Sequence, residues 1–553
     1  MALDQYGGYL SLPAPGGATG HFRTHKFAGP AGGRWLLVTP DGNGFFMRGV
    51  YHVAGSTQTT EQSTTYDTVF LAKYGTVATG WNQANLRLKA RGFNAHGPYT
   101  YTQALATGAY GGTTKLPFTY NGPNPGITGY NVGAGSFKIL YRGLDTAVSA
   151  VFAGSAGGFY PDAYDPVFTT NAVALFAADS NLATFKTSSW FIGMFSDDTD
   201  FLSGMGPGVD FATDPPVKYH WHLGFLALVT APTQTTNVHA AGTPAYTDSE
   251  VYTKTALQAW LTGKYGTVGA LNTAWGSTYT TLGSDGGWPT GAGLMDENGR
   301  STHSAWLGTS YNDPWNLPSM SATVKADLDL FLYEMALTLF TIERDAFKAI
   351  APDKLFMGPT NLGGAGWRSP TRGPILKAAG EILDVVNTGA DMSQEQTDFI
   401  ALWAGDVPIS TWHGIVANPD SGRFRNVTME AATWVLNTQS ERASYYQADM
   451  ANLLTKRAAS TGTIPWVGNL WWEWRDNMSE LVNWGLVSMR DNAYDGAEAR
   501  VAAGTDPWGY ATGGEEDDYG DFLGPVTAAH AGIEATLLSQ ITRRGGIAGR
   551  IHA

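Results

Sequence analysis

The apolar run Trp466-Val467-Gly468-Asn469-Leu470-Trp471-Trp472 ends at a carboxylate, Glu473, and this pattern of a short strand that meets a polar side chain recurs along the chain. Further runs of the same kind span 189–195, 354–358, 382–387 and 407–411. Helical patterns lie between the runs, most clearly at 326–350 and 440–458. A repeated strand-helix unit predicts an α/β fold with a parallel sheet covered by helices. Polar residues at the carboxyl ends of several strands favour a closed (β/α)8 TIM barrel over an open sheet.

Two segments depart from the strand-helix repeat. Residues 34–47 predict a strand, an Asp-Gly turn and a second strand, so residues 1–45 form an N-terminal capping hairpin segment. The barrel then occupies residues 46–545. Between about residues 200 and 320 the periodicity breaks in a stretch rich in Thr, Gly, Tyr and Trp, which we interpret as a long insertion after the fourth strand. It contains one helix-like piece, 251–264, and a segment of this size is expected to carry structure.

The composition argues against nucleic acid and membranes as partners and favours carbohydrate. The chain has 553 residues and a formal net charge of −14, so attraction to nucleic acid or to an anionic membrane is not expected. It contains 19 Trp, 25 Tyr and 25 Phe, whose flat faces stack on sugar rings when they are exposed and fill the core when they are not. Many stand beside Gly, Asn and Asp in loop-like sequence, which favours a carbohydrate partner.

No sequence feature demands a cofactor or a metal. The chain contains no cysteine, and no Gly-rich turn of the dinucleotide or P-loop kind follows the first strand. His220 and His222 have a spacing that suits a metal, but they lie in the insertion, and the acidic run 515–518 lacks the spacing of a calcium loop. No secretory signal and no membrane span is visible. The protein is therefore expected to be cytoplasmic, or secreted or periplasmic with its signal removed.

Five segments, taken in order, carry a resemblance to a known family: 33–50, 92–94, 192–197, 264–276 and 468–491. In this order the chain resembles the β-agarase-type glycoside hydrolases of family fifty and, more distantly, the wider clan of retaining barrel glycosidases. The resemblance implies a barrel with its active site at the carboxyl ends of the strands. It also implies hydrolysis of a β-linked glycan by two carboxylates, without a cofactor.

The sequence departs from that family at both expected catalytic glutamates. After strand four, the family's acid/base glutamate corresponds to Thr199 in this chain. After strand seven, the family's nucleophile corresponds to Thr411. Threonine does not deliver a proton at neutral pH, so other carboxylates must do the chemistry if the chain is a hydrolase.

Two groups of carboxylates are candidates for catalysis. Asp198 or Asp200, next to Asp197 at the end of strand four, is the expected proton donor, because neighbouring carboxylates raise one another's pKa. These aspartates could instead cap a helix or bind loop amides. Glu473 is the expected second carboxylate, although Arg475, Arg423 or His413 could neutralise it in a structural ion pair.

Other polar and aromatic side chains after barrel strands are candidates for substrate binding. Sugar hydroxyls would be recognised by histidines, amides and single aspartates, and sugar faces by tryptophans. The candidates are His52, Asn94, His96, Asn361, Trp367, Asp391, Trp412, His413, Asp420, Trp471, Trp472 and Trp474, together with Asp197.

Three functions are compatible with these residues. The first is a glycoside hydrolase with relocated carboxylates. The second is a catalytically silent barrel that binds glycans, which the two threonines suggest. The third is another carbohydrate-active chemistry on the same scaffold, such as that of a lyase or a transglycosylase.

Overall fold

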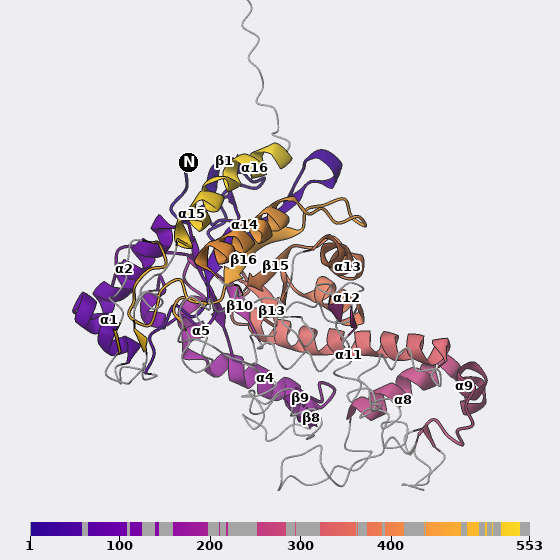
Figure 1. Ribbon diagram of the computed structural model, residues 1–553. Coiled ribbons are helices and arrows are strands. Elements are labelled where there is room, and N and C mark those ends of the chain that lie inside the picture. The colour runs from indigo at the N-terminus through magenta and orange to yellow at the C-terminus, as the bar shows by residue number, and fades with distance from the viewer. Residues whose placement is uncertain are drawn as a thin grey trace, which may run out of the picture. The chain divides into compact units, whose positions relative to one another are not determined.

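A computed structural model describes most of the chain (Figure 1). The described residues are 2–57, 65–107, 111–123, 139–142, 159–196, 209–210, 217–218, 252–283, 293–294, 321–360, 362, 373–389, 393–413, 436, 438–476, 484–496, 504–505, 511–512 and 521–541.

Eight strands form one parallel sheet, in the order β13-β10-β7-β6-β5-β16-β15-β14. In chain order these strands are β5 (Met47–Val50), β6 (Ala95–His96), β7 (Phe118–Asn121), β10 (Phe191–Phe195), β13 (Leu355–Gly358), β14 (Val386–Gly389), β15 (Ile409–His413) and β16 (Trp466–Trp471). The first and last strands of this order also lie against each other, because the Asp384 N–H, just before β14, donates to the Phe356 carbonyl of β13 at 2.9 Å. The sheet is therefore a (β/α)8 barrel, as the sequence predicts, and β10 is its fourth strand.

The N-terminal hairpin is part of a larger antiparallel sheet. Strands β1 (Tyr9–Pro13), β2 (Arg23–Phe27), β3 (Arg34–Val38) and β4 (Asn43–Phe45) pair in the order β1-β4-β3-β2. The predicted turn between β3 and β4 is present, with Gly42 at φ 91°, a conformation that glycine adopts without steric cost. Residue Met47 then begins the first barrel strand directly after this sheet.

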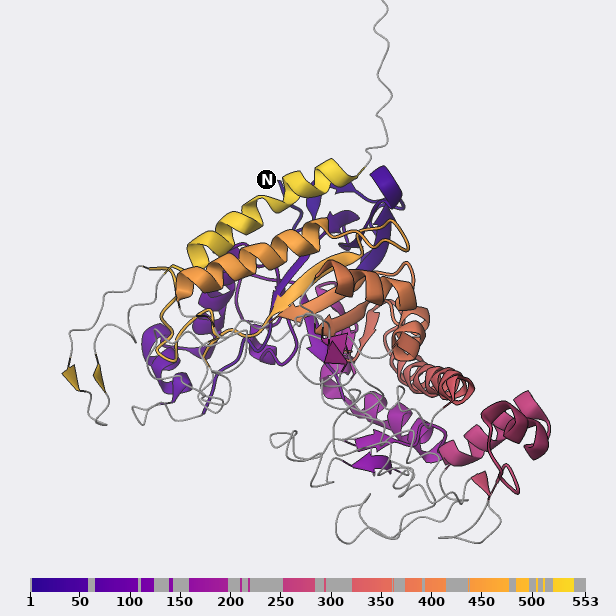
Figure 2. The same ribbon diagram turned by 45° about the vertical axis from the view of Figure 1, so that its right-hand side comes forward.

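The chain divides into two compact units: residues 1–120, 188–192 and 408–553 form the first, and residues 121–187 and 193–407 form the second. In the first unit, helices α1 (Tyr66–Tyr74) and α2 (Val77–Ala90) follow β5. Helix α14 (Gln439–Thr455) precedes β16 and begins with a capping box between Thr438 and Glu441. Helices α15 (Leu523–Ala531) and α16 (Ile533–Gln540) close the described part of the chain. They run beside α14 in both views (Figures 1 and 2).

The second unit is mainly helical. Its longest helix, α11 (Ala322–Lys348), packs on α12 (Gly373–Ile382), which in turn contacts α13 (Gln394–Ala404). Helices α4 (Pro166–Ala178) and α5 (Ser180–Phe185) lead into β10. The insertion after β10 contributes α8 (Tyr252–Tyr265), where the sequence predicts a helix, and α9 (Val268–Trp275).

Short elements complete the described residues. The 3-10 helices are η1 (Pro30–Gly32) and η2 (Thr102–Ala104), and the short antiparallel pairs are β8 (Ile139–Arg142) with β9 (Phe159–Pro161), β11 (Val209–Asp210) with β12 (Val217–Lys218), and β17 (Gly504–Thr505) with β18 (Ala511–Thr512).

The inserted helices are held by one buried carboxylate. Asp327 on α11 accepts hydrogen bonds from Lys264 and Tyr265 of α8 and from the Trp275 indole of α9, the last at 2.8 Å. Its side chain is 2% exposed. The insertion therefore carries regular structure that is tied to the helix before β13.

Candidate active site

Glu473 lies two residues beyond the carboxyl end of β16 and is wholly buried. Its Oε2 is 2.6 Å from Nδ1 of His52, and its Oε1 accepts a hydrogen bond from the Trp484 indole at 3.2 Å. The His52 side chain is 30% exposed. Among the described residues the side chain next to Glu473 is therefore that of His52, which follows the first barrel strand. Of the partners that the sequence suggests, Arg475 instead donates to the carbonyls of Asp476 and Gly55.

Backbone hydrogen bonds between neighbouring strands set this geometry. The Tyr51 N–H donates to the Trp471 carbonyl at 2.8 Å, and the His52 N–H donates to the Pro98 carbonyl at 2.9 Å. His52 and Tyr99 adopt φ values of 52° and 60°. This left-handed conformation costs residues other than glycine roughly 1 kcal/mol or more, and such strained residues are enriched at functional sites.

Aromatic side chains surround the pair. The Trp472 ring, partly exposed, has its centroid 5.4 Å from that of Tyr51, 5.8 Å from that of His52 and 6.1 Å from that of Trp484. Tyr99, also partly exposed, lies 6.1 Å from the His52 ring. A carboxylate and an imidazole beside partly exposed rings form a site suited to a ligand with both apolar faces and hydroxyls.

The segment 484–496 holds Trp484 over the carboxylate. The Trp484 carbonyl accepts from the Trp471 indole at 3.0 Å. The Gly485 carbonyl accepts from Arg442 at 2.8 Å, and its N–H donates to Asp476 Oδ1 at 2.9 Å. Hydrogen bonds to the backbone of Trp484 and of the next residue, Gly485, therefore fix the position of the Trp484 indole.

Asp476 is a second buried carboxyl near Glu473. Besides the Gly485 N–H, it accepts a hydrogen bond from the Tyr494 hydroxyl. Burial raises the pKa of Asp476 to about 7, while the Tyr494 hydroxyl and the Arg442 charge oppose that rise. Asp476 is wholly buried and is bonded to Gly485 and Tyr494, which both belong to the segment 484–496. Its role is therefore to hold this segment, which carries Trp484, in place.

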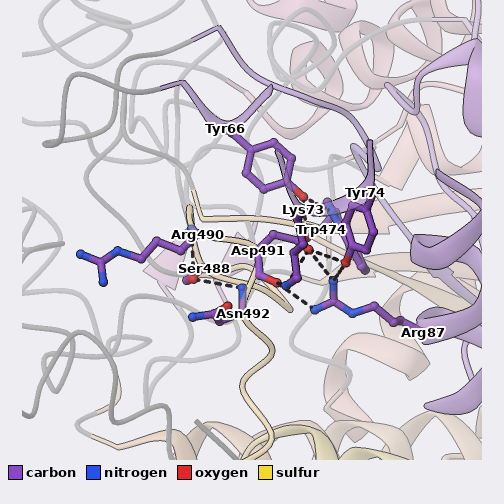
Figure 3. Close-up of polar contacts among 9 residues, drawn as sticks. All are labelled: Tyr66, Lys73, Tyr74, Arg87, Trp474, Ser488, Arg490, Asp491 and Asn492. Carbon is purple, nitrogen blue, oxygen red and sulfur yellow. Dashed lines mark hydrogen bonds and ion pairs between the residues drawn. The ribbon is translucent and has the colours of Figure 1, made fainter. Parts of the chain in front are cut away.

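Asp491 anchors the far end of the same segment (Figure 3). Its carboxylate accepts hydrogen bonds from Tyr66 at 2.8 Å, Tyr74 at 2.7 Å and Arg87 at 2.9 Å, and Lys73 lies 3.2 Å away. The Tyr66 hydroxyl also accepts from the Trp474 indole at 2.9 Å. The cluster thus ties the segment to α1 and α2.

Several residues predicted to bind substrate are buried in the core. Trp471 is 0% exposed, with its ring 5.4 Å from Tyr446 of α14 and 5.1 Å from Phe522, so it packs against the helix layer. Trp474 is 1% exposed. Both rings are buried, whereas Trp472, the other predicted tryptophan whose side chain the structure describes, is partly exposed.

Asn94 and His96 also have core positions. Asn94 precedes β6, at the amino end of the strand, where its amide accepts from the Arg48 N–H at 2.7 Å and donates to the Phe46 carbonyl at 3.0 Å. His96 is wholly buried, and burial lowers its pKa to about 3, so the imidazole is neutral. Both side chains are therefore buried within the fold, that of Asn94 at the amino ends of the strands.

Most of the remaining predicted residues lie outside the described part of the chain. Thr411 is wholly buried in β15. Outside the described residues lie Asp197, Asp198, Thr199, Asp200, Asn361, Trp367, Asp391, Asp420 and Arg423, and so do the side chains of Trp412 and His413. His220, His222 and the acidic run 515–518 lie outside them too.

Sequence reasoning missed Tyr51, Tyr99 and Trp484 as members of the site. Tyr51 and Tyr99 each follow a barrel strand closely, and this position was the available signal. Trp484 follows no strand, and only the folded chain brings it to Glu473.

Within the described residues, no group of three or more His, Cys, Asp or Glu side chains is arranged to hold a metal ion. The described helices also include none that is long and apolar enough to cross a membrane.

The fold is similar to those of three solved structures, two of which are named as agarases. A structure of an exo-β-agarase matches with a TM-score of 0.64 and 20% identity, over 97% of this chain and 68% of that one. The agarase AgWH50C matches with a TM-score of 0.63 and 17% identity, over 97% of this chain and 67% of that one. PfGH50B matches with a TM-score of 0.63 and 17% identity, over 96% of this chain and 68% of that one. No protein-family model and no curated protein matches the sequence.

At these identities the likeness concerns the fold. The chain has a (β/α)8 barrel whose fold is similar to those of solved agarases. The resemblance drawn from the sequence is thereby confirmed at the level of architecture.

Proposed function

We propose that the chain is a glycoside hydrolase that acts on a β-linked oligo- or polysaccharide. Glu473 and His52 would form one part of its catalytic machinery. One observation carries the proposal: a wholly buried carboxylate lies 2.6 Å from a partly exposed imidazole, beside the partly exposed Trp472, at the carboxyl ends of barrel strands. Active sites of (β/α)8 enzymes lie at this end of the barrel.

The pair suits acid-base chemistry. A carboxylate beside one ring nitrogen orients an imidazole, and the other ring nitrogen is then left for a ligand. Glycoside hydrolysis requires a second acidic group to protonate the leaving oxygen. We assign that part to Asp198 or Asp200, on the strength of their sequence position after strand four.

The proposal is tested by turnover of a panel of β-linked oligosaccharides, including agarose oligosaccharides, in the presence of a chelator. Glu473→Gln is expected to lower kcat/KM by about 10²- to 10⁴-fold, and so is Asp198→Asn or Asp200→Asn, whichever is the donor. Glu381→Gln, which neutralises an exposed carboxylate on α12, is the matched control and should leave activity unchanged. Full activity of Glu473→Gln would refute the assignment.

The threonines at positions 199 and 411 favour a second candidate, a barrel that binds glycans without cleaving them. Calorimetric binding of an oligosaccharide with no product after prolonged incubation would support it over hydrolysis. A product that absorbs in the near ultraviolet would instead indicate a lyase.

A further inference from the structure

A cavity of about 220 Å3 lies at the amino ends of β5, β6 and β7, away from the carboxyl ends that carry Glu473. We call it the basal cavity. Its lining includes Arg48 of β5, Lys89 of α2, Asn94 before β6 and Lys115 before β7. All of its lining residues belong to the first compact unit.

Arg48 brings an uncompensated charge to this cavity. The residue is 3% exposed, yet no described carboxylate forms an ion pair with its guanidinium, and its Nε has no hydrogen-bond partner among the described residues. A buried charge without a partner is costly, since neither water nor an opposite charge replaces its hydration.

Two of the titratable groups on which Arg48 acts, Tyr9 and His530, are neutral and do not offset its charge. Burial raises the pKa of the Tyr9 hydroxyl, and Arg48 only partly counteracts that rise. Burial lowers the pKa of His530 to about 3, and Arg48 lowers it further. Both ring nitrogens of His530 have other hydrogen-bonding partners: Nε2 lies 2.6 Å from the Tyr446 hydroxyl, and Nδ1 lies 2.8 Å from the Arg91 carbonyl.

The rest of the lining reinforces the positive charge. Lys89 and Lys115 are exposed and line the same cavity. No Asp or Glu occurs among the described residues of the lining. In a chain with a net charge of −14, a cavity that gathers three cations and no carboxylate is suited to an anion.

We propose that the basal cavity binds a small tetrahedral oxyanion of the phosphate or sulfate type, with Arg48 as its principal partner. The planar guanidinium donates two parallel hydrogen bonds to such an oxyanion, and its charge is then compensated inside the fold. Lys89 and Lys115 add attraction from the rim. The site is independent of the proposed glycan chemistry.

The experiment measures binding of inorganic phosphate to the full chain by titration calorimetry at pH 7 and low chloride, with glycerol phosphate in a parallel titration. Wild-type protein is expected to bind with one site per chain, and more weakly as NaCl is added. Arg48→Met should weaken binding by at least about tenfold, because it removes a charged hydrogen-bonding partner. The same variant should unfold at an equal or higher temperature than wild type without the anion, since it removes an unpaired buried charge.

Two double variants that keep Arg48 test the site even if Arg48→Met fails to fold. Lys89→Gln with Lys115→Gln should weaken phosphate binding by roughly threefold to tenfold. Lys186→Gln with Lys377→Gln, which removes two exposed cations that do not line the cavity, is the matched control and should bind as wild type does. Equal affinities in the two double variants would overturn the proposal. The proposal would also be overturned if added phosphate raised the unfolding temperature of wild type and of Arg48→Met by the same amount. That result would show only the general stabilising effect of such salts.

Glycerol phosphate distinguishes a free anion from a phosphate monoester. Binding of inorganic phosphate alone assigns the cavity to a free oxyanion, and tighter binding of the ester assigns it to a phosphorylated metabolite. Absence of binding by both refutes the site.

Discussion

Trp472 is a partly exposed aromatic side chain next in sequence to Glu473. Its neighbours Trp471 and Trp474 have the same chemistry but are 0% and 1% exposed. Solvent access therefore separates a candidate stacking surface from two core residues within one short stretch of sequence.

Trp472→Ala is expected to weaken glycan binding by about fivefold to thirtyfold, or about 1–2 kcal/mol, because a stacked aromatic ring contributes on this scale. Calorimetric titration with an oligosaccharide substrate measures the change. Trp403→Ala removes a ring that is 39% exposed on α13 and serves as the control. Equal affinities of the two variants would show that Trp472 does not contact the sugar.

His52 and Glu473 should act as one unit, because the imidazole is the exposed member of the pair and the carboxylate the buried one. His52→Ala and Glu473→Gln are each expected to lower kcat/KM by about 10²- to 10⁴-fold, and the double variant by no more than the larger single loss. Steady-state kinetics on the same oligosaccharide test this. Losses that multiply in the double variant would mean that the two side chains act separately.

At the scale of elements, the segment 484–496 has no regular helix or strand of its own in the described structure. It keeps its shape through bonds to other elements, with Asp476 and Arg442 at its start and the Asp491 cluster near its end. The position of Trp484 over Glu473 therefore depends on contacts made several residues away.

Asp491→Ala is expected to lower the free energy of unfolding by about 2–4 kcal/mol, because it leaves the buried Tyr66 hydroxyl without its acceptor and the partly exposed Arg87 and Lys73 without their anion. Denaturant unfolding measures the loss. Asp495→Ala is the matched control, because its carboxylate pairs with Arg91 at a more exposed position and should contribute less than about 1 kcal/mol. Comparable losses in both variants would contradict the anchoring role of Asp491.

At the scale of the whole molecule, buried ionisable groups make stability depend on pH. The pKa of Asp476 is raised to about 7 from an ordinary value of 3.8. Its protonated form therefore stabilises the fold, fully so below pH 3.8, and this contribution is lost as the pH rises towards 7. His96 and His530 act in the opposite direction, because their pKa values are lowered to about 3 and the fold loses stability as acid protonates them.

Asp476→Asn isolates the first effect, because the amide resembles the protonated carboxyl and does not titrate. Relative to wild type, the variant should gain stability steadily from about pH 4 to pH 7 and stay level above that. Denaturant midpoints at a series of pH values measure the difference, in which the histidine contributions cancel. A difference that does not vary with pH would mean that Asp476 is already ionised throughout the range.

Much of the architecture follows from the sequence alone, because local periodicity and strand-end chemistry are properties of short segments. The alternation of strands and helices predicts the barrel, the Asp-Gly turn predicts the β3-β4 hairpin, and the run ending at Glu473 predicts the eighth strand. Each prediction needs only neighbours along the chain.

Only the tertiary structure decided which side chains meet and which face each one takes. The pairing of Glu473 with His52 and Trp484 joins segments that are distant or irregular in sequence. The burial of Trp471, Asn94 and His96, and the unpaired charge of Arg48, depend on what packs against each strand. A sequence pattern shows that a residue is apolar or polar, but not whether its strand directs it to the helix layer, a cavity or the site, because that choice is made by long-range packing.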